Sequence, residues 1–223
     1  MKGRELQQMY RHWFFDLDGT LFDTEEDIKL AWHAAIRALG RECPRFDELY
    51  TTGPSLGDMV AVLFPDEQDK AALAASMRAA FASVYDSSGF PGTLPYPQAV
   101  RWMSELKSAG AHLYVATNKR MAPTLLILRK FDFLDVFDAV YTSDMYIGAA
   151  SAPRGIPTDR AAGKAQILAA ALEENAISPS EAVMVGDTRL DVEAGRANSM
   201  RTVGVAWGYG SREELAGADE IVG

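Results

Sequence analysis

An apolar run that ends in two aspartates constrains the fold of this chain more than any other stretch. It occupies residues 12–21 and reads HWFFDLDGTL. Such a run is typical of a strand buried on both faces of a parallel sheet. Ligands of open parallel α/β sheets bind beyond the carboxyl ends of the strands, so Asp16 and Asp18 are expected where ligands bind, with Gly19 allowing a sharp turn. The stretch alone is also compatible with an acidic surface turn, because Asp and Gly favour turns.

A second strand, expected at residues 182–185, also ends beside a carboxylate. Asp187 follows this strand, and Asp191 lies about one helical turn further on. If the two strands are neighbours, these acids converge with Asp16 and Asp18, and like charges at that density are tolerable only with a bound cation such as Mg²⁺. An aspartate can attack phosphorus, and a second carboxylate can serve as general acid and base. The acids are therefore well placed for phosphoryl chemistry at a magnesium site.

The net charge and the cysteine content indicate which partners and which cellular compartment to expect. The 223 residues carry a net charge of −9, which argues against nucleic acid or an anionic membrane as a partner. Cys43 is the only cysteine, so no disulfide can form within the chain and a reducing interior is the natural setting. The first dozen residues lack the apolar stretch of a signal peptide, and no run approaches the ~20 apolar residues of a membrane span. We expect a cytoplasmic protein.

Helical patterns between residues 23 and 88 predict a module inserted after the first strand. Apolar residues recur at helical spacing at 28–39 and again at about 66–85, with no strand pattern between them. The run SSGFPG then closes the segment, because Ser, Gly and Pro favour turns. We interpret residues 23–88 as a helical cap over the carboxylates, with residues 1–22 and 89–223 forming the core. The alternative is that the same helices pack directly on the sheet.

From residue 97 onward, helical and strand patterns alternate, which predicts an α/β fold with a Rossmann-like parallel sheet. The expected elements are helices at 97–109, at 121–131, from Lys164 and just before residue 220, and strands at 113–116, 139–142, 182–185, 202–206 and 220–222. Thr117 and Asn118 follow the first of these strands, where a hydroxyl and an amide can bind anionic oxygens or cap a helix. A long loop at 143–163 precedes Lys164, which at a helix start either has an anion nearby or is solvated.

The motifs together resemble the haloacid dehalogenase-like hydrolase superfamily, in its phosphatase branch, with the phosphoglycolate phosphatases as the nearest look-alikes. The resemblance covers almost the whole chain, and its four motifs stand in order: DLDGTL at 16–21, Thr117-Asn118, Lys164, and GDTRLD at 186–191. The stretch GPSL at 53–56 resembles the cap loop that contacts substrate in phosphoglycolate phosphatase-like members. The stretch VGVAWGYG at 203–210 resembles their final strand and loop.

The resemblance implies a role for each motif. Asp16 would be the nucleophile that forms an aspartyl-phosphate, Asp18 the general acid and base, Thr117 a phosphate ligand, and Lys164 the cation that steadies the phosphoryl group. In many relatives proline follows the motif lysine, whereas Ala165 follows it here. Arg154 and Arg160 stay open as alternative phosphate clamps.

The resemblance also implies a metal and a substrate site. Mg²⁺ would be held by Asp16, by the backbone carbonyl of Asp18 and by Asp187, with Asp191 as a further or supporting ligand. Substrate contacts are expected from Gly19, Thr20 and Asn118 in the core and from Gly53 and Ser55 in the cap.

These inferences predict a Mg²⁺-dependent phosphatase that hydrolyses a small-molecule phosphomonoester through an aspartyl-phosphate, as a monomer or homodimer. A small phosphorylated metabolite is the expected partner. Two alternatives stay open: a β-phosphoglucomutase-like phosphotransferase and a non-catalytic protein that binds a phosphorylated metabolite. The presence of both Asp16 and Asp18 favours an enzyme.

Overall fold

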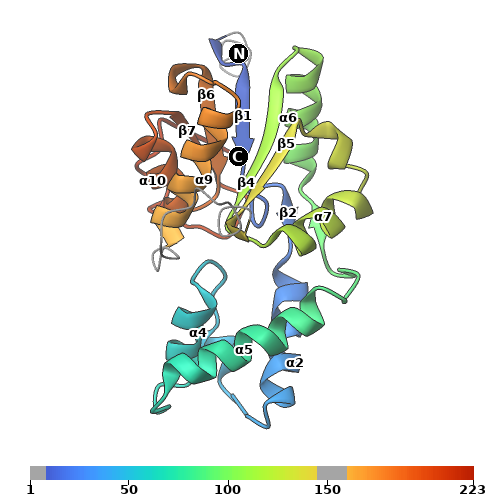
Figure 1. Ribbon diagram of the computed structural model, residues 1–223, viewed down its shortest axis with the longest axis vertical. Coiled ribbons are helices and arrows are strands. Elements are labelled where there is room, and N and C mark those ends of the chain that lie inside the picture. Colours follow the sequence, from blue (N-terminus) through green and yellow to red (C-terminus); the bar gives the residue numbers. More distant parts are fainter. Residues whose placement is uncertain (1–8, 145–159) are drawn as a thin grey trace. The chain divides into compact units, whose positions relative to one another are not determined.

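The computed structural model describes residues 9–144 and 160–223, and the chain divides into two compact units (Figure 1). The first unit comprises the residues up to Asp23 together with Leu94–Gly223, and the second comprises Thr24–Thr93. No helix among the described residues is long and apolar enough to cross a membrane.

The first unit is built on a six-stranded parallel sheet in the order β5-β4-β1-β6-β7-β8. Its strands are β1 His12–Phe15, β4 His112–Thr117, β5 Ala139–Thr142, β6 Ala182–Gly186, β7 Arg201–Val205 and β8 Glu220–Val222. The central strand β1 pairs with β4 on one side and with β6 on the other. This architecture confirms the predicted α/β class with a Rossmann-like parallel sheet. It also places the loops after β4, β1 and β6 next to one another at one edge.

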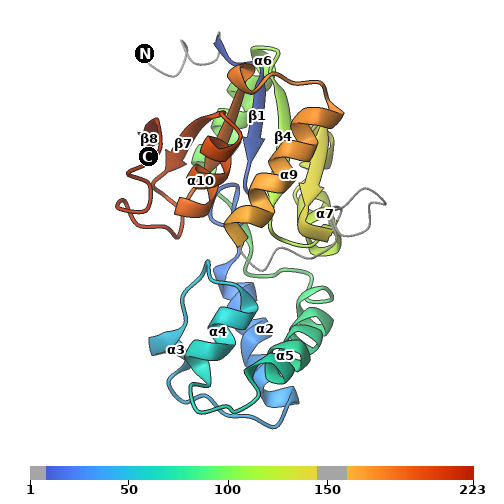
Figure 2. The same ribbon diagram turned by 60° about the vertical axis from the view of Figure 1, so that its left-hand side comes forward.

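Helices cover both faces of this sheet. They are α6 Pro97–Ser108, α7 Met121–Lys130, α9 Arg160–Glu174 and α10 Arg189–Ala197, with short 3₁₀ turns at Leu134–Val136 and Pro179–Glu181. Helices α9 and α10 pack on each other and on one face of the sheet, and α6 contacts β4 from the opposite face (Figure 2).

Aromatic residues of β1 alternate between the two faces, as the period of a strand requires. Trp13 and Phe15 pack edge-on against Trp102 of α6. Phe14 stacks on Tyr114 of β4, within the apolar cluster that includes residues of α9. Trp13, Phe14 and Phe15, which follow the half-buried His12, are therefore buried from both faces of the sheet.

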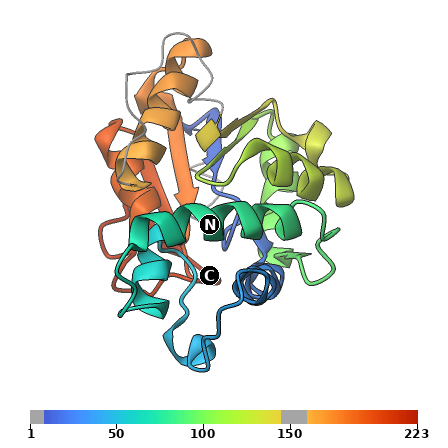
Figure 3. The ribbon, with the colours of Figure 1, turned by 60° about the horizontal axis from the view of Figure 1, so that its bottom comes forward.

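The second unit is entirely helical. Its helices are α2 Glu25–Ala38, α3 Phe46–Leu49, α4 Leu56–Leu63 and α5 Lys70–Tyr85. Helix α5 packs against both α2 and α4 (Figure 3). Buried side chains from all four helices form one apolar cluster, which includes Trp32, Phe46, Met59 and Met77.

Two details of this unit differ from the sequence prediction. The short helices α3 and α4 were not predicted. Helix α4 begins after Ser55, whose side-chain oxygen accepts a hydrogen bond from the backbone N–H of Asp58 at 3.1 Å. Helix α5 begins at Lys70 rather than near Asp66, because the Asp69 carboxylate accepts a hydrogen bond from the N–H of Ala72 at 2.9 Å and so caps the helix there.

The first unit also departs from the prediction in three places. An antiparallel pair, β2 Phe22–Asp23 with β3 Leu94–Pro95, was not predicted. The residues at 212–217 form turns instead of the expected short helix. Helix α9 starts at Arg160, so Lys164 lies in its second turn and not at its start.

Candidate active site

Three carboxylates converge beyond the ends of β1 and β6. Asp16 follows β1, Asp187 follows β6, and Asp191 lies in the first turn of α10. One carboxylate oxygen from each lies within 4.8 Å of the others, and all three residues are buried. The neighbouring positions of β1 and β6 satisfy the condition on which the predicted convergence depended.

A buried lysine binds two of these acids. The Nζ atom of Lys164 lies 2.8 Å from Oδ2 of Asp16 and also donates a hydrogen bond to Oδ1 of Asp191. Burial disfavours the ammonium ion, but the Asp16 and Asp191 carboxylates outweigh burial and raise the pKa of Lys164 above its usual value. Lys164 therefore has anions beside it and is not a solvated residue of a helix start.

The acids carry more negative charge than Lys164 balances. Burial, partly offset by Lys164 and reinforced by Asp191, raises the pKa of Asp16 to about 6. Burial, together with the neighbouring Asp191 and Asp16, raises the pKa of Asp187 to about 8. Two raised pKa values in one cluster mean that a further cation would stabilise the carboxylate forms.

Hydrogen bonds fix the orientation of Asp187 and Asp191. Asp187 accepts hydrogen bonds from the N–H of Tyr209 at 2.8 Å and from the hydroxyl of Thr20 at 3.2 Å. Asp191 accepts hydrogen bonds on Oδ2 from the N–H and hydroxyl of Thr188, at 3.0 and 2.8 Å. With Lys164 on its other oxygen, Asp191 is held in place by the protein through both oxygens.

Asp18 does not join the three acids. Its carboxylate binds Nζ of Lys119, at 2.8 Å through Oδ1 and 2.9 Å through Oδ2. Lys119 directly follows Thr117 and Asn118, and sequence analysis did not single it out. The available signal was its position, since it is a lysine just after a strand that ends in polar residues.

Thr117 and Asn118 lie at the end of β4 but do not cap a helix. The N-cap residue of α7 is Arg120, which excludes the capping interpretation for that helix. The hydroxyl oxygen of Thr117 instead accepts a hydrogen bond from the N–H of Lys119 at 3.2 Å. Asn118 lies beside the start of α9, because a Cβ atom on Gly163 would lie 3.7 Å from its Oδ1.

A glycine-containing loop after β7 packs against the acids. A Cβ atom on Gly208 would lie 2.2 Å from the carbonyl oxygen of Gly19, and one on Gly19 would lie 2.1 Å from Oδ2 of Asp187. The indole N–H of Trp207 donates to the carbonyl oxygen of Thr20 at 3.1 Å. This loop thus packs closely against Gly19 and Thr20. The close contact is possible only because Gly19 and Gly208 have no side chains.

The remaining predicted residues lie elsewhere. Gly53, with φ of +120°, and Ser55 belong to the second unit, where Ser55 caps α4. Arg154 and most of the loop at 143–163 lie outside the described residues, and the side chain of Arg160 does as well.

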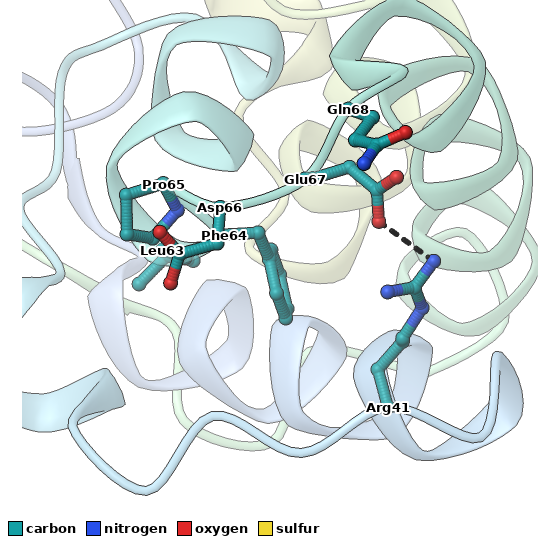
Figure 4. A pocket seen from close by; sticks show the side chains of 7 residues that line it. All are labelled: Arg41, Leu63, Phe64, Pro65, Asp66, Glu67 and Gln68. Atoms are coloured by element: carbon teal, nitrogen blue, oxygen red, sulfur yellow. Dashed lines mark ion pairs between the residues drawn. The ribbon is translucent and has the colours of Figure 1, made fainter.

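The second unit also contains a pocket of about 320 Å³ (Figure 4). It is lined by Arg41, Leu63, Phe64, Pro65, Asp66, Glu67 and Gln68. An ion pair of 2.8 Å between Arg41 and Glu67 lies along it. None of the predicted site residues lines this pocket.

Relatives with assigned names include phosphatases and a kinase. The chain is 30% identical over 219 residues to phosphoglycolate phosphatase of Neisseria gonorrhoeae, covering 94% of this chain and 87% of the relative. It is 29% identical over 198 residues to tyrosine-protein kinase PtkA of Mycobacterium tuberculosis, which covers 88% of this chain. The chain spans only 62% of the length of that kinase.

Solved structures share the fold. A crystal structure of a predicted phosphatase from Clostridium acetobutylicum superposes with a TM-score of 0.78 at 27% identity, covering 96% of this chain and 94% of the other. The sequence pattern of the haloacid dehalogenase-like hydrolases matches residues 13–205, which include the three converging acids, Lys119 and Lys164. This chain therefore belongs to the haloacid dehalogenase-like hydrolases.

Proposed function

We propose that this protein is a cytoplasmic, Mg²⁺-dependent phosphatase that hydrolyses a small-molecule phosphomonoester through an aspartyl-phosphate on Asp16. The observation that carries the proposal is the position of the Asp16 carboxylate. It lies at the carboxyl end of β1, within 4.8 Å of two further acids and 2.8 Å from the buried ammonium group of Lys164. The named phosphatase relative supports the same class of substrate.

The acids fit a magnesium ion. Mg²⁺ prefers oxygen ligands, and the three converging carboxylates offer oxygens within 4.8 Å of one another. The raised pKa values of Asp16 and Asp187 indicate that a cation would stabilise their carboxylate forms. Asp16, Asp187 and the backbone carbonyl of Asp18 would hold the ion, with Asp191 supporting them. When bound, the ion would offset the negative charge that builds up on the phosphoryl oxygens.

The proposed reaction has two steps, formation of the aspartyl-phosphate and its hydrolysis. In the first, an oxygen of Asp16 forms a bond to phosphorus while the bond from phosphorus to the leaving oxygen breaks, and Asp18 gives that oxygen a proton. In the second, Asp18 takes a proton from water as the water oxygen bonds to phosphorus and the Asp16–phosphorus bond breaks. Lys164 stabilises the charge on the phosphoryl group, and Thr117 and Asn118 donate hydrogen bonds to its oxygens.

Selectivity is proposed to come from the helical unit acting as a cap. In this proposal residues 24–93 cover the site, and Gly53 and Ser55 of the loop before α4 contact the part of the substrate that is not phosphate. Gly19 and Thr20 complete the contacts from the core. The enzyme would act as a monomer or homodimer on a small phosphorylated metabolite, without nucleic acid or membrane partners.

A phosphotransferase is the second candidate, because the relative PtkA is named a kinase. The same aspartyl-phosphate would then be passed to a hydroxyl group of an acceptor instead of water. A protein that binds a phosphorylated metabolite without catalysis would use the same residues but form no phosphoenzyme.

Intact-mass spectrometry separates these functions. The protein is allowed to react with 4-nitrophenyl phosphate and Mg²⁺, and the reaction is then quenched. Asp18→Ala should accumulate one phosphate adduct on Asp16, because removal of the general base slows hydrolysis of the adduct more than it slows transfer from a good leaving group. Asp16→Asn should show none, since an amide cannot attack phosphorus. An adduct in Asp16→Asn, or one that maps to another residue, would overturn the proposal.

Steady-state assays then test the metal and the acceptor. Hydrolysis by the wild type should require Mg²⁺ and should be lost in Asp187→Ala. Full activity in excess chelator would contradict the metal site. A phosphoenzyme that forms with Mg²⁺ but loses its phosphoryl group only when an acceptor alcohol is added, with formation of that alcohol's phosphate ester, would support the phosphotransferase.

A further inference from the structure

Asp16 and Asp18 are bound by different lysines. Lys164 binds Asp16 through one carboxylate oxygen, whereas Lys119 binds both oxygens of Asp18, at 2.8 and 2.9 Å. From this second pair we infer that Lys119 is a positioning residue, which holds the Asp18 side chain in the orientation from which its carboxyl group, when protonated, passes a proton to the leaving oxygen. The inference rests on the proposed role of Asp18 as general acid and base.

The side chain of the lysine is more buried than that of the aspartate it binds. Its side chain is 7% exposed, compared with 25% for Asp18. Its backbone is fixed at both polar groups: the N–H donates to the hydroxyl oxygen of Thr117 at 3.2 Å, and the carbonyl oxygen accepts from the N–H and hydroxyl of Ser143 at 3.3 and 3.4 Å. The loop after β4 is thereby tied to the residue after β5, so the backbone that carries Lys119 is held in place.

A two-point contact restricts Asp18 more than a single hydrogen bond would. Asp18 lies in a turn after β1, and its side chain could adopt other rotamers if only one oxygen were bound. Proton transfer depends on the acid being within hydrogen-bond reach of the leaving oxygen, so loss of orientation lowers the rate even when the acid is present. Asp16 is bound by a second lysine, Lys164, 2.8 Å from its Oδ2.

The dependence of kcat/KM on the leaving group distinguishes this role from a purely structural one. A leaving group that is a strong base needs a proton from Asp18 as the bond to phosphorus breaks, and one that is a weak base does not. Phenyl phosphate and 4-nitrophenyl phosphate differ in this property and have nearly the same shape. The ratio kcat/KM reports only the steps up to formation of the phosphoenzyme, so hydrolysis of the intermediate does not obscure the comparison.

The variants are Lys119→Met, Lys119→Gln and Lys119→Arg, measured with both substrates and saturating Mg²⁺. We expect the two uncharged variants to lower kcat/KM about 100-fold for phenyl phosphate but less than about 10-fold for 4-nitrophenyl phosphate. Lys119→Arg should recover most of the activity towards phenyl phosphate. The matched control is Lys107→Met, which removes a half-exposed lysine paired with Asp138 and should change neither value.

A double-mutant cycle with Asp18→Asn completes the test. If Lys119 acts through Asp18, adding Lys119→Met to Asp18→Asn should not change the ratio between the two substrates any further. Equal losses for both substrates in the Lys119 variants would overturn the inference and would indicate a role in phosphate binding or folding. If Asp18→Asn itself shows no dependence on the leaving group, the proposed function of Asp18 fails instead.

Discussion

The ammonium group of Lys164 in α9 lies 2.8 Å from Oδ2 of Asp16 at the end of β1. The side chain of Lys164 is only 2% exposed. The same ammonium group binds Asp191. One cation thus serves two carboxylates, while the third, Asp187, is held by the hydroxyl of Thr20 and the N–H of Tyr209. Charge balance in this cluster accordingly depends on Lys164.

Replacement of Lys164 by methionine is expected to lower kcat at least about 100-fold at pH 7, because the phosphoryl group loses the cation that stabilises its charge. Loss of Lys164 also removes the neighbour that keeps the pKa of Asp16 from rising above about 6, so less Asp16 is a carboxylate able to attack. Lys164→Arg should not restore activity, since a larger guanidinium group does not fit a fully buried position. Retention of more than about a tenth of wild-type kcat by Lys164→Met would contradict the role of this lysine.

The stability of the metal-free protein is expected to rise as the pH falls from 8 to 5. The pKa values of Asp187 and Asp16 in the folded protein, about 8 and about 6, lie above the ordinary value of 3.8. The folded state therefore binds more protons than the unfolded state between these limits, and its free energy of unfolding falls as the pH rises through them. Thermal unfolding in chelator at pH 5, 6, 7 and 8 measures the trend, and a Tm that rises with pH over this range would contradict it.

Asp187→Asn should raise Tm of the metal-free protein at pH 8 and flatten this pH dependence, because it removes a buried charge that no cation balances. Each gain of about 1 kcal/mol corresponds to about 2–4 °C for a chain of this size. Asp138→Asn is the opposite control: hydrogen bonds from Lys107, the N–H of Leu113 and His112 outweigh burial and lower the pKa of Asp138, so this variant should be less stable at pH 8. Added Mg²⁺ should stabilise the wild type more at pH 8 than at pH 6, since protons compete for the same oxygens, and should stabilise Asp187→Asn little.

The strand ends that carry the acids could be predicted from the sequence because their signal is local. An apolar run followed by aspartate identifies both Asp16 and Asp187, and the parallel sheet then brings them together once β1 and β6 are adjacent. The short helices α3 and α4 were missed because so few residues give little periodic pattern, and α4 depends on a capping interaction at Ser55.

The partners of the lysines could not be predicted in the same way. Lys119 and Asp18 are 101 positions apart, and Lys164 and Asp191 are 27 apart, so only the folded sheet defines these pairs. A local rule was also misleading for Lys164. A lysine at a helix start opposes the helix dipole, but α9 begins four residues earlier, at Arg160, so the rule does not apply to Lys164. Long-range ion pairs are determined by topology and not by sequence spacing.

Gly19→Ala is expected to inactivate and destabilise the protein, because the new Cβ would lie 2.1 Å from Oδ2 of Asp187. Gly110→Ala is the matched control: Gly110 has φ of +81°, compared with +80° for Gly19, but no atom lies within 4 Å of its Cβ position. Both variants carry the cost of a left-handed backbone, about 1 kcal/mol, so the difference between them isolates the contact with Asp187. Equal losses of Tm, with activity kept in both, would show that the space around Gly19 is not limiting.

Asp27→Ala is expected to destabilise the helical unit, because Asp27 joins its two ends. The Asp27 carboxylate in the first turn of α2 is buried and accepts hydrogen bonds from the N–H of Gly92 at 3.1 Å and from the hydroxyl of Thr93 at 2.6 Å. Truncation leaves the buried hydroxyl of Thr93 and the half-buried N–H of Gly92 without this acceptor, which costs about 1–3 kcal/mol.

The measurement is thermal unfolding combined with limited proteolysis of residues 86–93, where release of the chain from Asp27 should speed cleavage. Asp66→Ala, at an exposed aspartate of the same unit, should change the free energy of unfolding by less than about 0.5 kcal/mol. Asp27→Asn should fall between the two, since its amide keeps one acceptor oxygen but offers a donor where Asp27 has the second. If Asp27→Ala and Asp66→Ala unfold at the same temperature and are cleaved at the same rate, the contact with Gly92 and Thr93 does not hold the ends of this unit together.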